Sequence, residues 1–171
     1  GLLFPIKIED YDPAWPCLYK KELEQLNREL GVYIQRIDHI GSTAVPNLRA
    51  KPVIDILLQI KDCNIASLKD KLINLGYEIL YKPENPPPHL FCVKGYTLTG
   101  YQGQPCHMHV RYPGEWSELR FRDILIAHPP IARDYARLKD ELAAKYKHDR
   151  DAYTEAKTVF INAILDSTVE I

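Results

Sequence analysis

This 171-residue sequence lacks any apolar run close to the roughly 18 residues that a membrane-spanning helix needs, so we expect no membrane span. It also lacks a charge excess, since 22 lysines and arginines stand against 23 aspartates and glutamates. A general nucleic-acid-binding surface normally requires a basic excess, so we expect none. The first dozen residues have neither the basic start nor the cleavage pattern of a signal peptide, which favours a cytoplasmic protein.

Cysteine is scarce and widely spaced. The four cysteines include no Cys-x-x-Cys pair, and a chain of this length buries a core large enough to need no disulfides. We interpret them as reduced thiols of a cytoplasmic protein, with a zinc site as the less favoured alternative. They are Cys17, Cys63, Cys92 and Cys106.

No linker, repeat or low-complexity tract divides the sequence, which predicts a single domain over residues 1–171. The hydrophobic periodicity predicts a core over about residues 4–112 and a helical cap over about 115–166, and therefore an α+β protein. In the core we expect strands at 5–8, 34–40, 53–60, 77–81, 89–94 and 106–112, helices at 15–30 and 65–75, a short helix or loop at 43–48, and a proline-rich loop at 82–88. In the cap we expect helices at 119–126, 131–146 and 153–164.

The segment HIGSTAVPNLRAKPVIDI, residues 39–56, is the most informative part of the chain. It places Gly41, Ser42 and Thr43 directly after one predicted strand and Asp55 inside the next. Backbone N–H groups at a Gly-Ser turn suit a phosphate. A carboxylate inside an aliphatic strand is costly to bury unless a metal, a cation or a reaction uses it. The pattern therefore predicts a site that handles phosphate.

Two basic residues lie between this turn and Asp55. Lys51 is predicted to contact phosphate, and Arg49 carries a charge suited to the same task. In the alternative interpretation, Asp55 simply forms an ion pair with Lys51 or Arg49 at the edge of the sheet.

His107 and His109 lie two residues apart in the segment CHMHVRY, so a strand would present both imidazoles on one face. Such a pair can bind a metal or a phosphate, or transfer a proton. The alternative is a half-exposed pair on a solvated face. Further along the chain, Arg122 is adjacent to Asp123, and we expect either an ion pair between them or a phosphate contact by Arg122. We assign Lys139 and Lys157, with their acidic neighbours, to solvated helical faces.

The sequence resembles the GrpB family, which is placed in the nucleotidyltransferase superfamily and also occurs fused to dephospho-CoA kinases. The resemblance runs from about Tyr11 to Ile164. It is carried by four segments in order, HIGSTAVPNLRAKPVIDI, CHMHVRY, FRDILIAHPPIARDYARLK and DRDAYTEAKTVFINAIL. It implies a nucleotidyltransferase-like fold, with a mixed β-sheet, helices packed on it and a C-terminal helical extension.

The resemblance also implies roles for individual residues. Gly41 and Ser42 match the phosphate-binding turn, and Asp55 matches the strand carboxylate. His107, His109, Arg122 and Asp123 match other positions of the family's motifs. The chain departs from the family pattern at Asn47, where the family usually has glycine, and at Ile124, where it usually has tyrosine.

The metal site expected of the superfamily is incomplete in this sequence. Its nucleotide-transferring members present two carboxylates, two residues apart on one strand, to hold Mg²⁺. Here the second position is Leu57, which cannot coordinate a metal. A divalent metal, Mg²⁺ or Mn²⁺, would therefore depend on Asp55, His107 and His109, and imidazole favours Mn²⁺ or Zn²⁺.

Three hypotheses follow. In the first, the protein is a nucleotidyl- or phosphotransferase that binds a nucleotide, with Asp55 and His109 as catalytic residues and an acceptor hydroxyl as nucleophile. In the second, it is an inactive module that binds a nucleotide or CoA-type ligand. In the third, Asp55, His107 and His109 hold a transition metal for another phosphohydrolase or phosphotransfer reaction.

Overall fold

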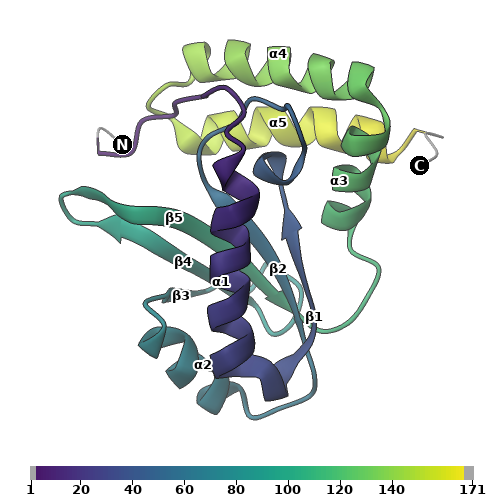
Figure 1. The fold of residues 1–171 in the computed structure, drawn as a ribbon. Coiled ribbons are helices and arrows are strands. Elements are labelled where there is room, and N and C mark those ends of the chain that lie inside the picture. The colour runs from purple at the N-terminus through teal and green to yellow at the C-terminus, as the bar shows by residue number, and fades with distance from the viewer. Residues whose placement is uncertain (1–2, 168–171) are drawn as a thin grey trace.

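The computed structural model describes residues 3–167 and contains a mixed five-stranded sheet in the order β1-β2-β5-β4-β3 (Figure 1). β2 and β5 are parallel, and every other neighbouring pair is antiparallel. The parallel pair lies in the interior of the sheet, with an antiparallel strand on each side. The strands are β1 (Ile34–Ile40), β2 (Ile54–Ile60), β3 (Glu78–Tyr81), β4 (Leu90–Thr97) and β5 (Gly100–Arg111).

Helices cover both faces of the sheet. α1 (Ala14–Leu30) and α2 (Ile65–Asn74) pack on one face, and α3 (Ser117–Ala127), α4 (Pro129–Lys145) and α5 (Arg150–Leu165) form the cap at one end of the other face. Two short 3₁₀ turns, η1 (Gly31–Tyr33) and η2 (Ser42–Ala44), precede and follow β1. The helical extension predicted over 115–166 corresponds to α3–α5.

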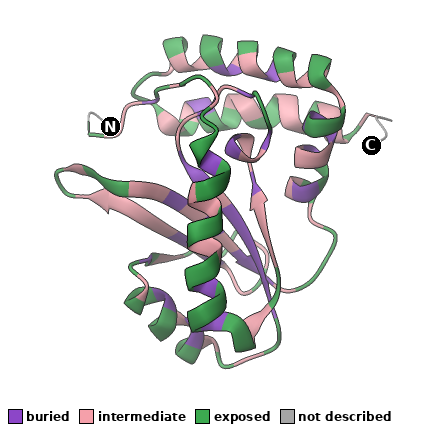
Figure 2. Cartoon of the chain, in the orientation of Figure 1, coloured by how far each residue is buried: buried purple, intermediate pink, exposed green. Residues whose placement is uncertain are grey.

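The apolar run in β2 explains its central place. Ile54, Ile56 and Leu58 are fully buried and pack with Trp15 and Leu26 of α1. Leu57 faces the opposite way, into a small cluster with residues of β1 and α3. Because both faces of β2 are covered, its sequence is almost continuously apolar. Figure 2 shows β2 buried along most of its length, while exposed residues alternate with buried ones along α1 and α4.

One expected element at the N-terminal side is wrong. Residues 5–8 form no strand, because the backbone N–H of Ile6 donates to the carbonyl of Lys147 in the cap, and only an isolated bridge joins Glu9 to Ala50. Residues 43–48 form the expected short helix or loop, which starts with the end of the three-residue turn η2.

The β4–β5 hairpin is longer than the sequence predicts. Its strands continue through the glycine-rich segment to Thr97 and Gly100, with a register shift between Lys94 and Tyr96. Gly95 makes the bulge feasible, since its φ is +91° and an added Cβ would lie 2.7 Å from Cα of Pro105. The extension pairs Tyr96 with Tyr101 and places the Tyr96 hydroxyl 2.7 Å from Nε2 of His107.

Within the described part of the chain, no helix is both long and apolar enough to span a bilayer. All four cysteines have free thiols, as predicted.

Candidate functional site

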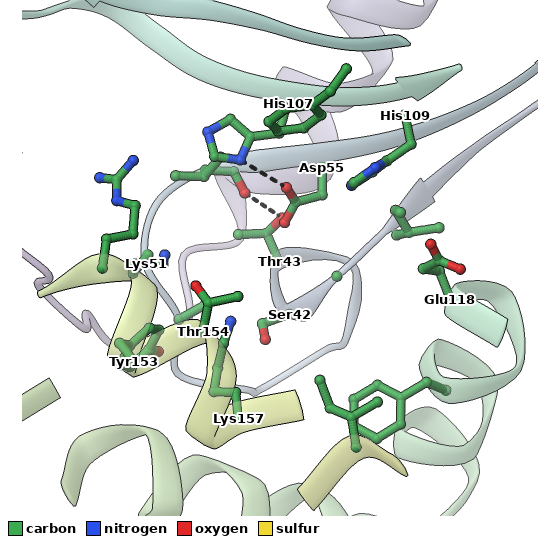
Figure 3. Close-up of a pocket in the computed structure, with 18 of the residues that line it drawn as sticks. Ser42, Thr43, Lys51, Asp55, His107, His109, Glu118, Tyr153, Thr154 and Lys157 are labelled. Atoms are coloured by element: carbon green, nitrogen blue, oxygen red, sulfur yellow. Dashed lines mark hydrogen bonds and ion pairs between the residues drawn. The ribbon is translucent and has the colours of Figure 1, made fainter. Parts of the chain in front are cut away.

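A cavity of about 890 Å³ lies between the sheet and the cap (Figure 3). Its floor comes from the turn after β1 and from β2, β4 and β5, and its roof comes from α3, α4 and α5. Every residue predicted for the site contributes to its lining, although the segments are far apart in sequence. These residues are Gly41, Ser42, Thr43, Lys51, Asp55, His107, His109 and Arg122.

The turn after β1 is shaped by its contact with β2. Gly41 has a φ of +74°, a conformation that favours glycine, and an added Cβ would lie 2.5 Å from Oδ2 of Asp55. Ile40 pairs with Asp55 in the antiparallel ladder, so the turn begins beside the carboxylate. The predicted association between the glycine turn and the strand acid is therefore present.

The buried side chain of Thr43 holds the same turn in place through hydrogen bonds. The hydroxyl of Thr43 donates to the carbonyl of Val53 over 3.0 Å and lies 2.9 Å from Nε2 of His39. Since the hydroxyl proton is used toward Val53, Nε2 of His39 donates to Thr43. The His39 ring also stacks on Tyr19 at 4.6 Å, and burial lowers its pKa to about 4. Thr43 therefore supports the turn from inside with its hydroxyl.

Asp55 and His107 are register partners on the two parallel strands. Nδ1 of His107 lies 3.6 Å from Oδ1 of Asp55, and its Nε2 lies 2.7 Å from the hydroxyl of Tyr96. Burial raises the pKa of Tyr96 to about 12, so the phenol stays protonated and donates to Nε2. The Nδ1 proton then points toward Asp55, which gives an ordered Tyr96–His107–Asp55 chain.

Burial controls the charges in this chain. It raises the pKa of Asp55 to about 6, against the opposing effect of Lys157, Lys51 and Lys139. Burial, reinforced mainly by Lys51, lowers the pKa of His107 to about 3, so the imidazole is neutral near pH 7. Of the three groups in this chain, Asp55 therefore has the pKa closest to neutral pH.

Three lysines converge on the same cavity. Lys139 is buried, and its Nζ donates to Oγ of Ser42 over 2.9 Å and to the carbonyl of Arg49. Lys51 and Lys157 approach Tyr153, with their ammonium groups 5.0 and 4.9 Å from the ring centroid. Figure 3 shows Lys51, Lys157 and Ser42 on the same side of the cavity.

These ammonium groups have no close anionic partner in the protein. Among residues 3–167, none of the three lysines forms an ion pair with a carboxylate. Burial lowers the pKa of Lys51 to about 8 and also lowers the pKa values of Lys139 and Lys157. A group of desolvated lysines without an ion-paired carboxylate is suited to an anionic ligand, because the ligand restores the lost charge compensation.

The assignment of Lys139 and Lys157 to solvated helical faces is wrong. Lys139 follows Tyr135 by four residues on α4, and Lys157 follows Tyr153 by four residues on α5. Residues four apart share one helix face, and both tyrosines lie on the buried face. The spacing from a core tyrosine was therefore a signal in the sequence that these lysines turn inward.

The alternative ion pair for Asp55 does not form with Arg49. The Arg49 guanidinium binds Asp10 and Asp140, with its Nε 3.2 Å from Oδ2 of Asp140. Lys51 lines the cavity but does not pair with Asp55 either.

Arg122 also lines the cavity, but its guanidinium is already engaged. It forms the predicted ion pair with Asp123 at 2.9 Å, lies 3.5 Å from Asp38 and donates to the carbonyl of His39. Its role as a phosphate contact stays a prediction.

The residues present do not form a ready metal site. In the part of the chain that the structure describes, no group of three or more His, Cys, Asp or Glu side chains is arranged to hold a metal ion. His109 occurs at the register position of Leu57, and its ring lies 5.0 Å from that of Phe91. Asp55 and His107 are therefore close to each other, but His109 is not placed to act as a third metal ligand beside them. The binding of Mg²⁺ or Mn²⁺ by these residues stays a prediction.

Asn47 offers a test of the family pattern. Its φ is +66°, a left-handed conformation that asparagine accepts more readily than most residues. The replacement of the family's usual glycine is therefore compatible with this backbone.

The family model described as GrpB protein matches residues 5–167. A UPF0157 protein of Pseudomonas aeruginosa is 40% identical over 163 residues, which cover 94% of this chain and 66% of that protein. A dephospho-CoA kinase of Mycolicibacterium paratuberculosis is 30% identical over 176 residues, which cover 90% of this chain and 43% of the kinase. The chain thus spans only part of the length of both relatives.

One solved structure is similar over nearly the whole chain. It is the crystal structure of a conserved protein GrpB from Enterococcus faecalis, and it aligns with a TM-score of 0.75 and 26% identity. The alignment covers 94% of this chain and 100% of that one.

Proposed function

Since this chain belongs to the GrpB family, we propose that its cavity binds a phosphorylated small molecule of the nucleotide or CoA type. The kinase relative supports this class of ligand, because its name refers to dephospho-CoA. The cytoplasmic location suggested by the cysteines is part of the same proposal.

The lysine cluster carries the proposal. Lys51, Lys139 and Lys157 face one cavity without a carboxylate partner, and a buried cation is costly until it is paired. Phosphate oxygens supply several negative charges within a small volume, and charge-assisted hydrogen bonds to them are among the stronger ones in proteins. A ligand with a phosphate chain would satisfy all three ammonium groups at once.

The three lysines would act differently. Lys139 is held in place by Ser42 and by the carbonyl of Arg49, so the position of its amine is fixed. Lys51 and Lys157 rest against Tyr153 through cation–π contacts, which a phosphate can replace without breaking an ion pair. The charge of Asp55 favours the protonated form of both, which keeps them available to an anion.

A second candidate function is transfer of the ligand's phosphoryl or nucleotidyl group. The Tyr96–His107–Asp55 chain favours it, because it places a neutral imidazole behind a carboxylate that faces the phosphate site. An acceptor hydroxyl would bond to the α-phosphorus, pyrophosphate would leave with its bonding electrons, and the hydroxyl proton would pass to Asp55. The lysines would stabilise the charge that develops on the phosphate oxygens. A role for Mg²⁺ or Mn²⁺ at Asp55, and the alternative Asp/His transition-metal chemistry, stay separate predictions.

Thermal unfolding tests the proposal. The protein is heated with ATP, GTP, CTP, UTP or dephospho-CoA, each with and without Mg²⁺ or Mn²⁺. A ligand present at about 100 times its Kd should raise the Tm by roughly 5–10 °C. Lys157→Met should abolish the rise, while the exposed Lys145→Met on α4 should retain it.

The outcomes separate the hypotheses. A rise without metal supports a binding module, and a rise that needs metal and disappears in Asp55→Asn supports the transferase. No rise with any of these ligands would contradict the proposal, as would an equal rise in Lys157→Met.

A further inference from the structure

The two ends of the cavity differ in chemistry, and we infer that the end away from Lys51, Lys139 and Lys157 binds a planar, nitrogen-containing ring of the same ligand. The ligand would then be a nucleotide whose base lies near Phe91, His109 and Glu118. This inference rests on the proposed phosphate site and adds the identity of the group attached to the phosphate.

The arrangement of the labelled side chains gives the ligand a direction. In Figure 3, Lys51 and Lys157 lie on one side of Asp55, whereas His109 and Glu118 lie on the other. All of them line the same cavity. A molecule with its phosphates at the lysines can therefore extend past Asp55 toward His109 and Glu118, and a cavity of about 890 Å³ is of the size that encloses such ligands.

Aromatic side chains form the floor at this second end. The Phe91 ring on β4 lies 5.0 Å from the His109 ring on β5, with 31° between their planes. The ammonium group of Lys82 lies 5.0 Å from the centroid of Phe91. Aromatic rings pack favourably in stacked and edge-to-face arrangements, so this floor suits another ring better than an aliphatic chain.

His109 supplies a polar group that lacks a partner. Its Nδ1 is buried without a hydrogen bond within the described residues, although buried polar atoms are nearly always paired. Burial lowers the pKa of His109 to about 4, so the ring is neutral and offers one donor and one acceptor. A neutral imidazole is a weak partner for phosphate and packs favourably with another ring.

Glu118 places a hydrogen-bond acceptor at this end. Two nitrogens of Arg111 lie 3.0 and 2.7 Å from its two carboxylate oxygens, and this contact lowers the pKa of Glu118 in spite of burial. The ion-paired carboxylate can accept an N–H from a ring. A ring that carries such a group therefore has a partner at this end of the cavity.

Isothermal titration calorimetry with two kinds of probe tests the inference. Inorganic tripolyphosphate reports only the phosphate end, and ATP, GTP, CTP and UTP report both ends. We expect at least one nucleotide to bind about tenfold tighter than tripolyphosphate, in line with stacking of a base on aromatic side chains. Phe91→Leu should remove most of that difference and leave the tripolyphosphate Kd unchanged. Tyr81→Leu is the matched control, because Tyr81 is exposed on the neighbouring strand.

Failure of this inference is distinguishable from failure of the proposed function. If tripolyphosphate binds and no nucleotide binds more tightly, the ring site is wrong and the phosphate site stands. The ring site is also wrong if Phe91→Leu weakens both probes equally. If neither probe binds the wild-type protein, both proposals are overturned.

Discussion

Gly41 and Asp55 are packed so closely that no side chain fits between them, since a Cβ on Gly41 would lie 2.5 Å from Oδ2 of Asp55. The carboxylate therefore rests against bare backbone at the start of the turn. This contact joins the predicted phosphate-binding turn to the predicted strand acid, and each limits the position of the other.

Gly41→Ala should destabilise the protein through both the clash and the positive φ. Gly103→Ala is a suitable control, because Gly103 has a nearly equal φ of +75° but no atom within 4 Å of an added Cβ. We expect a loss of about 1 kcal/mol for Gly103→Ala and at least about 2 kcal/mol for Gly41→Ala, measured by urea unfolding. Equal losses in the two variants would show that Asp55 does not restrict this position.

Asp55→Asn should stabilise the protein most at neutral pH. The pKa of Asp55 is raised from 3.8 to about 6 in the folded state, mainly by burial. Between these pH values the unfolded chain has already released the proton, whereas Asp55 in the folded protein still holds it. The free energy of unfolding of the wild type therefore falls as the pH rises, while the amide of the variant does not titrate. The free energy of unfolding of Asp55→Asn, minus that of the wild type, should therefore increase from about pH 4 to about pH 7.

Urea unfolding at these two pH values measures the difference, with the exposed Asp62→Asn as control. A variant that unfolds at neutral pH would instead indicate that Asp55 has a structural pairing role.

Phosphate binding should weaken as the pH rises through about 8. Lys51 has its pKa lowered to about 8 by burial, with Lys157 and Arg150 also lowering it and Asp55 raising it. A bound anion favours the charged ammonium, so deprotonation of Lys51 costs affinity. The Kd for tripolyphosphate, measured by calorimetry across this range, should rise by up to about tenfold per pH unit for each proton lost.

The matched variant is Lys51→Met, in which the slope of log Kd against pH should decrease. The remaining slope would come from Lys139 and Lys157. An unchanged slope would assign the titration to other groups.

Thr43→Val should cost stability although its shape is nearly preserved. The buried hydroxyl of Thr43 connects the carbonyl of Val53 with Nε2 of His39, and valine would leave both without a partner. We expect a loss of about 1–3 kcal/mol in the free energy of unfolding. Thr158→Val, at an exposed position of α5, removes a comparable hydroxyl and should change stability by less than about 0.5 kcal/mol. A similar small change at Thr43 would contradict the role assigned to its hydroxyl.

The nucleotidyltransferase-like α+β fold and the GrpB family were both predictable from the sequence, and both are confirmed. The strands with clear boundaries were also predictable. The strand Ile34–Ile40 is followed by Gly41, which has a positive φ. The strand Ile54–Ile60 is apolar at every position except Asp55 and Gln59. Residues 5–8 looked similar to a strand, but their hydrogen bonds go to the cap, which local periodicity does not reveal.

The cationic half of the site was less accessible to sequence reasoning. Lysine on an amphipathic helix is normally exposed. The spacing from a core tyrosine places Lys139 and Lys157 on the inner helix faces, and the packing of α4 and α5 over the sheet turns those faces into the cavity. Tyr96 was missed because the glycine-rich segment indicated a turn, whereas a bulge at Gly95 continues the strand. Both errors concern positions that depend on contacts between distant segments.

The parallel pairing of β2 with β5 has a consequence for how the protein is made. β1 and β2 are neighbours in sequence, as are β3, β4 and β5, so each group can form early from local contacts. Asp55 and His107 come together only when the second group docks on the first, and Lys157 arrives later still from α5. During synthesis, a ligand therefore cannot nucleate the folding of this domain, because its binding site is completed only after α5 has left the ribosome.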